Sequence, residues 1–260
     1  MLRPAKISDF QPHRIETLPF GVAKLKAPAM TRELLPFTVR LVRSEGDLNK
    51  AVDIRHSAYA RHLPEFAQTL TAPESADAEN GVVVLLAESK VDGSPLGTMR
   101  IQTNQFKPLC LEQSVKLPTW LKTLRLAEAT RLGVTNAKGG RLVTTVLFKA
   151  FYLYCYQIGI EWMVITGRAP VDRMYERLLF EDVFPGLGYI PFQHVGNLPH
   201  RVMSSNVETA EDRWTAAKHP LFDFAFRTHH PDIQVGGPCP SYLSAMTLPT
   251  LTAHGASLSM

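Results

Sequence analysis

Cysteine is scarce in this chain, and that scarcity argues against two classes of protein. The 260 residues include three cysteines, Cys110, Cys155 and Cys239, and none belongs to a CxxC motif or to a Cys/His pair with metal-ligand spacing. Disulfide scaffolds and zinc modules both need several cysteines at short, regular intervals. We therefore expect no metal site and no disulfide framework, and we interpret the thiols as buried or idle.

Long apolar runs are missing as well. Although 45% of the residues are hydrophobic, no segment approaches the roughly 18 consecutive apolar residues that span a bilayer. The first residues, MLRPAKISDFQPHR, contain no apolar core of the kind found in a secretory signal. The sequence therefore predicts a cytoplasmic protein without an integral membrane segment.

Charge is moderate and unevenly distributed. The net charge is +4, and residues 234–260 contain no Asp, Glu, Lys or Arg. We expect a poorly ordered tail at 233–260, an N-terminal arm at 1–36 and one domain at 37–232. The mild basicity suits a phosphate-bearing ligand or an acidic partner, whereas its dispersal along the chain argues against nucleic-acid binding.

Strand and helix patterns alternate through the middle of the chain. Period-two or continuous apolar runs predict strands, apolar spacing of three to four residues predicts helices, and Asp92-Gly93 predicts a hairpin turn. Strands are predicted at 37–44, 82–89, 96–103, 124–134 and 161–168, with a final hairpin in 189–205 that turns at Gly196-Asn197; helices are predicted at 44–63, 141–159, 170–184 and within 208–230, and 64–81 reads as a loop. This order predicts an α/β fold with a mixed central sheet flanked by helices.

The predicted strand LRLAEATRLGV, residues 124–134, carries Glu128 and Arg131 in its middle. An unpaired charge inside a sheet costs several kcal/mol, so these two side chains should have partners or a task. One interpretation is a buried ion network of Arg55, Asp77, Glu128 and Arg131 that fixes the architecture. The other is a catalytic site, which we favour because such networks are rarely the most stable solution.

A possible anion site follows that strand. Lys138, Gly139, Gly140 and Arg141 lie where a strand ends and a long helix begins. A helix N-terminus offers free N–H groups and the positive end of a dipole, and glycines let a phosphate approach the backbone. A plain strand-to-helix turn explains the same residues equally well.

The helix after strand 161–168 contains Tyr175-Glu176-Arg177-Leu178-Leu179-Phe180. Preceded by the glycine-containing turn, the long helix and the strand, it resembles the GCN5-related N-acyltransferase (GNAT) fold, whose signature is approximately Tyr-Glu-Lys-Leu-Gly-Phe. Leu179 replaces the glycine of that signature. On residue type alone, Tyr175 is more often a packed aromatic than a catalyst.

Three further motifs narrow the resemblance. RHSAYARHLPEF (from Arg55, with Tyr59), GTMRI (with Arg100) and EATRLGV (with Glu128 and Arg131) resemble acyl-homoserine-lactone synthases in their order. The remainder, including YIPFQHVGNLPHRVMSSNV and AAKHPLFDFAFRTHHPDI, is more similar to bacterial long-chain N-acyl amino acid synthases.

The resemblance implies an acyltransferase that moves a long acyl chain from acyl carrier protein or coenzyme A to the amine of an amino acid. No cofactor is needed, since the acyl-pantetheine thioester is a co-substrate. An α-amino group titrates near 8, so a base such as Glu128 would help by about 10²–10⁴-fold. Arg100 or Arg131 would hold the acceptor carboxylate, with neither favoured.

Other residues take lesser predicted roles. Backbone N–H groups around Leu132, Gly133 and Val134 would meet the oxyanion, and Tyr175 would protonate the leaving thiolate. The predicted substrate-binding residues are Arg55, Tyr59, Asp77, Leu132, Gly133 and Val134; the predicted phosphopantetheine-binding residues are Lys138, Gly139, Gly140 and Arg141, with Lys149 as a further candidate for the carrier surface; and Phe148, Phe151, Tyr152 and Tyr156 could line an acyl cleft.

Three alternatives remain at this stage. The acceptor could be another amine, as in ornithine-lipid synthesis, or S-adenosylmethionine in lactone formation. The chain could also be a non-catalytic module that binds an acyl carrier or lipid. Glu128 together with Arg100 and Arg131 argues against a pure binding module, because such a module needs no base.

Overall fold

The computed structural model describes residues 30–136 and 139–236. A mixed sheet forms its centre, and its strands run in the order β11-β2-β3-β4-β5-β6-β9-β7, with β8 paired to β9 off this path. Their bounds are β2 (Phe37–Leu41), β3 (Val82–Ser89), β4 (Pro95–Thr103), β5 (Leu126–Val134), β6 (Trp162–Gly167), β7 (Glu181–Asp182), β8 (Ile190–Phe192), β9 (Leu198–Asn206) and β11 (Ile233–Gln234).

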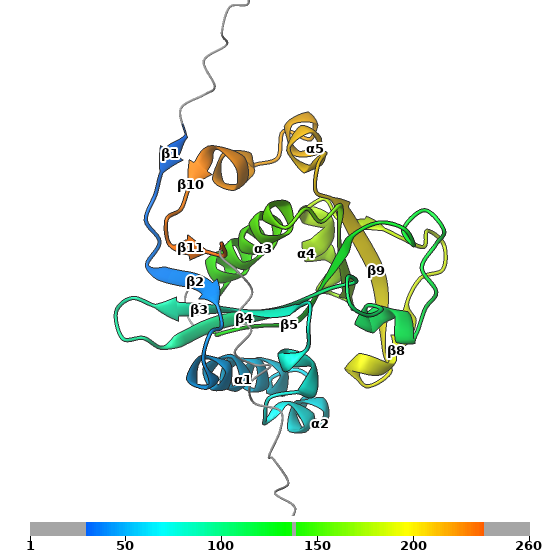
Figure 1. Cartoon of the computed structure of the whole chain (residues 1–260), viewed down its shortest axis with the longest axis horizontal. Coiled ribbons are helices and arrows are strands. Elements are labelled where there is room, and N and C mark those ends of the chain that lie inside the picture. Colours follow the sequence, from blue (N-terminus) through cyan, green and yellow to red (C-terminus); the bar gives the residue numbers. More distant parts are fainter. Residues whose placement is uncertain (1–29, 137–138, 237–260) are drawn as a thin grey trace, which may run out of the picture.

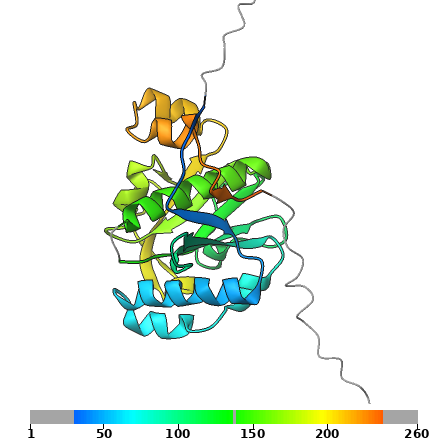
Figure 2. The ribbon, with the colours of Figure 1, turned by 90° about the vertical axis from the view of Figure 1, so that its left-hand side faces the viewer.

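Helices cover both faces of the sheet (Figures 1 and 2). They are α1 (Glu45–Ala60), α2 (Pro64–Ala67), α3 (Gly140–Gln157), α4 (Asp172–Arg177) and α5 (Ala210–Ala216), followed by a short π-helix at Asp223–Arg227. In the two ribbon views α1 and α2 lie on one side of the sheet and α3 and α4 on the other, with α5 beyond α3. Within the described residues, no helix is long and apolar enough to cross a membrane.

Strand β3 shows how the sequence produces these layers. Side chains alternate across a strand, so Val84 and Leu86 pack with Leu48 of α1 on one face. Leu85 points to the other face and joins the cluster of α3 residues. Because both faces are covered, β3 is apolar almost throughout instead of alternating with polar residues.

Local signals account for the element ends. The Ser44 side chain accepts a hydrogen bond from the Asp47 N–H at 3.1 Å, which caps α1. Gly93 (φ 70°) lies in the predicted β3–β4 hairpin turn, a backbone conformation that favours glycine. Helix α3 begins after Gly139, whose φ is 107°.

The predicted α/β order is confirmed, with three differences in detail. Helix α4 covers Asp172–Arg177 instead of 170–184, because Leu179 has a φ of 59° and the chain then enters β7. The predicted loop 64–81 contains α2 and two 3₁₀ turns. The helical pattern within 208–230 forms α5, the π-helix and β10 (Thr228–His229).

Both predicted termini of the domain carry short strands. Strand β1 (Thr31–Arg32), in the predicted arm, pairs in parallel with β10. Strand β11, at the start of the predicted tail, pairs in parallel with β2. The predicted domain boundaries at residues 36 and 233 stay predictions, because pairings of two residues do not define where a domain begins or ends.

Candidate functional site

A groove opens where two parallel strands separate. Strands β5 and β6 pair from Leu126↔Trp162 to Ala129↔Ile165, and both continue beyond that point. The groove has a volume of about 300 Å³ and borders the last six residues of β5, the end of α1, α4 and the turn before β9. The backbone of β5 beyond Ala129 therefore faces a space that can admit a narrow ligand.

A β-bulge shapes this end of β5. Arg100 of β4 pairs with Thr130 and Thr98 pairs with Gly133, so Arg131 and Leu132 together oppose Met99. Arg131 has a φ of 55°, which is costly for a residue other than glycine. The bulge turns the Arg131 side chain toward a cluster of charged residues beneath the sheet.

That cluster joins three arginines to two carboxylates. Arg55 donates to both carboxylate oxygens of Asp77 at 2.9 and 3.0 Å, and Arg131 donates to both oxygens of Glu74 at 2.7 and 2.6 Å. Arg100 lies between the two carboxylates, 3.2 Å from Glu74 and 3.4 Å from Asp77. Burial opposes ionisation of Glu74 and Asp77, but these guanidinium partners outweigh it and lower both pKa values.

Glu128 lies near this cluster but makes no hydrogen bond to any of its arginines. Its side chain is fully buried, and Oε2 accepts from the Leu111 N–H at 3.2 Å. Oε1 has no hydrogen-bond partner. Burial raises the pKa of Glu128 to about 7, against the lowering effects of the Leu111 N–H and of the Arg100 charge. The residue can therefore exchange a proton near neutral pH.

Several other predicted residues line the groove, whereas some lie beneath it. Tyr59, Arg131, Leu132, Gly133, Val134 and Tyr175 border it. Arg55, Asp77, Arg100 and Glu128 are buried and are not among its lining residues. Burial raises the pKa of Tyr175, whose ring packs 5.6 Å from that of Phe148, so this phenol is held in its neutral form.

Gly133 has a packing role in addition to its place in the groove. A Cβ at this position would lie 3.1 Å from the Ala58 Cβ and 3.2 Å from the Arg55 Cα. The absence of a side chain lets α1 approach β5 closely. This approach brings Arg55 under the sheet and Tyr59 to the groove.

The predicted phosphate turn is described in part. Gly139, Gly140 and Arg141 lie at the start of α3, which has no side-chain cap at its N-terminus, whereas Lys138 lies outside the described residues. Thr144, one turn into α3, borders the groove. The first turn of α3 thus reaches the groove through Thr144, but none of the three turn residues lines it.

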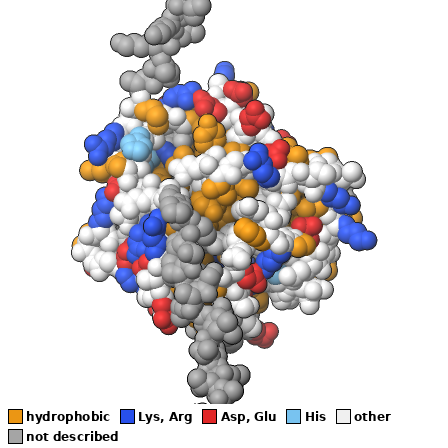
Figure 3. All heavy atoms as spheres, in the orientation of Figure 1, with side chains coloured by type: hydrophobic (Ala, Val, Ile, Leu, Met, Phe, Trp, Pro, Cys, Tyr) orange, Lys and Arg blue, Asp and Glu red, His pale blue; other side chains and the backbone are white. Residues whose placement is uncertain are grey.

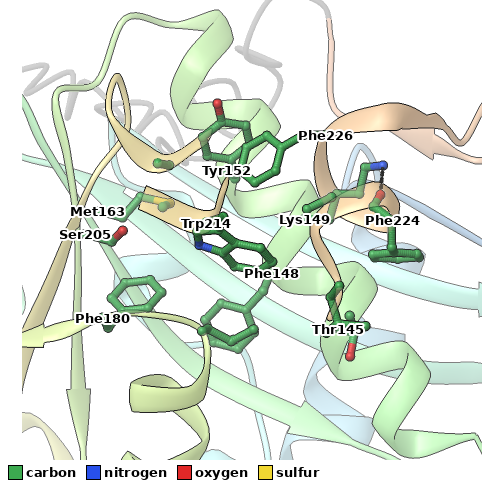
Figure 4. Close-up of a pocket in the computed structure, with 14 residues that line it drawn as sticks. Thr145, Phe148, Lys149, Tyr152, Met163, Phe180, Ser205, Trp214, Phe224 and Phe226 are labelled. Carbon is green, nitrogen blue, oxygen red and sulfur yellow. Dashed lines mark hydrogen bonds between the residues drawn. The ribbon is translucent and has the colours of Figure 1, made fainter. Parts of the chain in front are cut away.

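The prediction for Lys149 is wrong. Lys149 is buried, and its ammonium group donates to the carbonyl oxygens of Phe224 at 2.6 Å and Thr228 at 2.5 Å. Figure 4 shows the side chain directed at the segment that contains Phe224. A carrier protein cannot reach this amine, because the C-terminal segment covers it.

An apolar cavity of about 50 Å³ lies beside α3, between that helix, strands β6 and β9, and α5 (Figure 4). Phe148 and Tyr152 of the predicted aromatic set line it together with Phe180 and Trp214. Phe151 instead packs in the main core, and Tyr156 is exposed. Figure 3 shows hydrophobic side chains gathered over the area of α3 on this face.

Two residues that were not predicted belong to the site. Glu74 binds Arg55, Arg100 and Arg131, and His194 borders the groove 3.9 Å from Glu128. A weak local signal exists for Glu74, which forms a capping box with Asp77. We find no such signal for His194. Among the described residues, no group of His, Cys, Asp and Glu side chains is arranged to hold a metal ion.

Comparison with solved structures finds proteins whose fold is similar to that of this chain. FeeM, an N-acyl amino acid synthase from uncultured soil microbes, superposes with a TM-score of 0.54 and 18% identity over 70% of this chain and 96% of FeeM. The CoA-dependent acyl-homoserine lactone synthase BjaI gives a TM-score of 0.49 and 15% identity over 80% of this chain and 98% of BjaI. Arabidopsis thaliana NAA60 gives a TM-score of 0.46 and 17% identity over 66% of this chain and 99% of NAA60.

Sequence comparison adds no family assignment. No protein-family model matches the chain, and no curated protein matches it. The likeness to FeeM is one of fold, and it agrees with the predicted α/β fold, in which helices flank a mixed sheet.

Proposed function

We propose that this chain is a cytoplasmic N-acyltransferase that transfers a long acyl chain from a pantetheine thioester to the amine of an amino acid. The observation that carries the proposal is the groove between β5 and β6 with a buried carboxylate of raised pKa beside it. The fold shared with FeeM, an N-acyl amino acid synthase, supports the same class of reaction.

Direct transfer fits the side chains around the groove. The amine attacks the thioester carbonyl and the C–S bond breaks. The sulfur takes up the second amine proton and leaves as a thiol. Glu128 takes the first proton, because a carboxylate with a pKa near 7 is a stronger base than an ordinary Glu and is still ionised at neutral pH. Backbone N–H groups of the β5 bulge, near Leu132, would stabilise the oxyanion.

Arg131 is the better candidate for the acceptor carboxylate. It lines the groove, and its Nη1 atom has no hydrogen-bond partner. Arg100 is 2% exposed and donates through Nε to Thr130 and through Nη1 to the two acidic residues. A guanidinium N–H without a partner in a residue that lines the groove is the donor we assign to the acceptor carboxylate, whereas the Nε and Nη1 atoms of Arg100 already have partners.

The donor would lie along the groove with its phosphate at the start of α3. Free N–H groups and Arg141 at that end attract an anion. An acyl carrier protein, with an acidic surface, or coenzyme A would present the same pantetheine arm. The apolar cavity behind α3 is separated from the groove by Tyr175, Phe148 and Phe180, which pack on one another, and it is a candidate for the far end of the acyl chain.

Product analysis tests the proposal. The full chain is mixed with acyl-carrier and CoA thioesters of several lengths and with the twenty amino acids, and products are identified by mass spectrometry. We expect an N-acyl amino acid, and we expect the corresponding amino acid amide to be a poor acceptor because it lacks the carboxylate. Equal use of acid and amide would remove Arg131 from its role.

Two other outcomes would change the assignment. A lactone formed from S-adenosylmethionine, or acylation of ornithine in preference to other amines, would keep the class of reaction and change the acceptor. Tight binding of the acyl carrier without any amide product would favour a non-catalytic module.

A further inference from the structure

His194 occupies a defined position between the groove and Glu128. It lies in the 3₁₀ turn Gln193–Val195 that precedes β9. The Arg131 guanidinium donates to the His194 carbonyl oxygen at 3.1 Å, and the imidazole packs edge-on to Phe192 with 5.7 Å between ring centroids. These contacts hold the ring at the border of the groove.

The polar atoms of this pair have no partners. Among the described residues, neither ring nitrogen of His194 has a hydrogen-bond partner, and neither does Oε1 of Glu128, although all three atoms are buried. Buried polar atoms are normally satisfied, so three unsatisfied atoms in two facing side chains require an explanation. His194 Nε2 lies 3.9 Å from Glu128 Oε1, and a shift of about 1 Å would bring them to hydrogen-bond distance.

Burial and the nearby positive charges keep the imidazole of His194 neutral. Burial, with the nearby charges of Arg131 and Arg100 and with His200, lowers the pKa of His194 to about 3. A neutral imidazole has one donor and one acceptor nitrogen. It can therefore accept a proton on the side of the groove and donate one toward Glu128.

We propose that His194 relays the proton of the acceptor ammonium group to Glu128. This inference rests on the proposed acyl transfer and adds a catalytic residue to it. It follows from the position of the ring, since His194 borders the groove and Glu128 does not.

The transfer balances without any further reactant. The acceptor ammonium gives one proton to the free imidazole nitrogen, and the other nitrogen gives its proton to the Glu128 carboxylate. The neutral amine then attacks the thioester carbonyl, and its second proton leaves with the departing thiol. Glu128 later returns its proton to solvent by the reverse path.

Kinetics of His194→Ala and His194→Gln test the relay. We expect kcat to fall about 10²-fold or more in both variants with the KM of the thioester changed less than threefold. Added imidazole should restore part of the kcat of His194→Ala and none of that of His194→Gln, whose side chain fills the site. His229→Ala, at an exposed position in β10, is the matched control and should keep wild-type kinetics.

The pH profile separates proton transfer from a structural role. Glu128 is faced by Arg100, Arg131, Cys110 and His194, so its titration in the active enzyme reflects all four. The wild-type kcat should rise with pH through about 7, as Glu128 ionises, and the residual kcat of His194→Gln should lose this step.

Each unfavourable result has a distinct meaning. Wild-type kcat in both His194 variants, or an unchanged pH step together with no imidazole rescue, would overturn the relay and leave the acyltransferase proposal intact. Absence of any amide product from the wild-type chain would overturn both.

Discussion

Replacing Glu128 with Gln should make the protein more stable above neutral pH. Glu128 is fully buried, and its pKa rises from 4.5 to about 7 in the folded state. The amide keeps an oxygen that can accept the Leu111 N–H and removes the titrating group. The fold would therefore no longer carry the free-energy cost of ionising a carboxyl group out of water.

The sign and size follow from proton linkage. Between pH 4.5 and 7 the folded state binds more protons at Glu128 than the unfolded state does, so this residue lowers the free energy of unfolding as pH rises. This pKa shift of Glu128 corresponds to a loss of about 3 kcal/mol in the free energy of unfolding. The loss is complete above pH 7 and nearly absent below about pH 4.5. The free energy of unfolding of Glu128→Gln should thus exceed that of wild type by about 3 kcal/mol at pH 8.5 and by less than about 1 kcal/mol at pH 5.

Urea unfolding followed by circular dichroism at both pH values measures the difference. The exposed Glu208 provides the control: Glu208→Gln should change the unfolding free energy similarly at pH 5 and pH 8.5. A Glu128→Gln protein that is no more stable than wild type at pH 8.5, or whose gain is equal at both pH values, would refute the reasoning. The same variant should have lost acyl transfer, so stability and activity would move in opposite directions.

Two further changes test the packing beneath the groove. Glu74→Gln removes one of the two carboxylates that neutralise three buried arginines. It should lower the free energy of unfolding, measured by urea titration at pH 7, by about 3 kcal/mol. A loss below about 1 kcal/mol would show that water solvates these guanidinium groups. Gly133→Ala places a Cβ 3.2 Å from the Arg55 Cα and should lower the free energy of unfolding by about 1–3 kcal/mol. Gly46→Ala is the control: its added Cβ comes no closer than 3.9 Å to a neighbouring atom, so it should not destabilise α1. Equal melting temperatures for the two glycine variants would contradict the close approach of α1 and β5.

The charged residues of β4 and β5 divide into two roles. Three residues of the predicted ion network, Arg55, Asp77 and Arg131, do form ion pairs beneath the sheet. The network also includes Arg100 and Glu74. Glu128 makes no hydrogen bond to the described members of that network, and its Oε1 has no hydrogen-bond partner among the described residues. Its position outside the network, facing His194 at the border of the groove, is the physical reason for our proposal that Glu128 has a chemical task.

The sequence by itself determined the order of elements and the candidate carboxylate. Periodicity, together with the length of each apolar run, located β2, β3, β4, β5, α3 and β6. Glu128 was recognisable because a charge in the middle of a buried strand is costly wherever the strand lies.

Tertiary structure alone decided what surrounds that carboxylate. Glu74 and His194 are 54 and 66 positions from Glu128 in sequence, and both reach the site through turns whose direction no local pattern reveals. The choice between Arg100 and Arg131 also depended on the bulge at Arg131, a mismatch in strand register that periodicity does not encode. Periodicity reports which residues avoid water, whereas contacts between distant segments depend on how the packed elements meet.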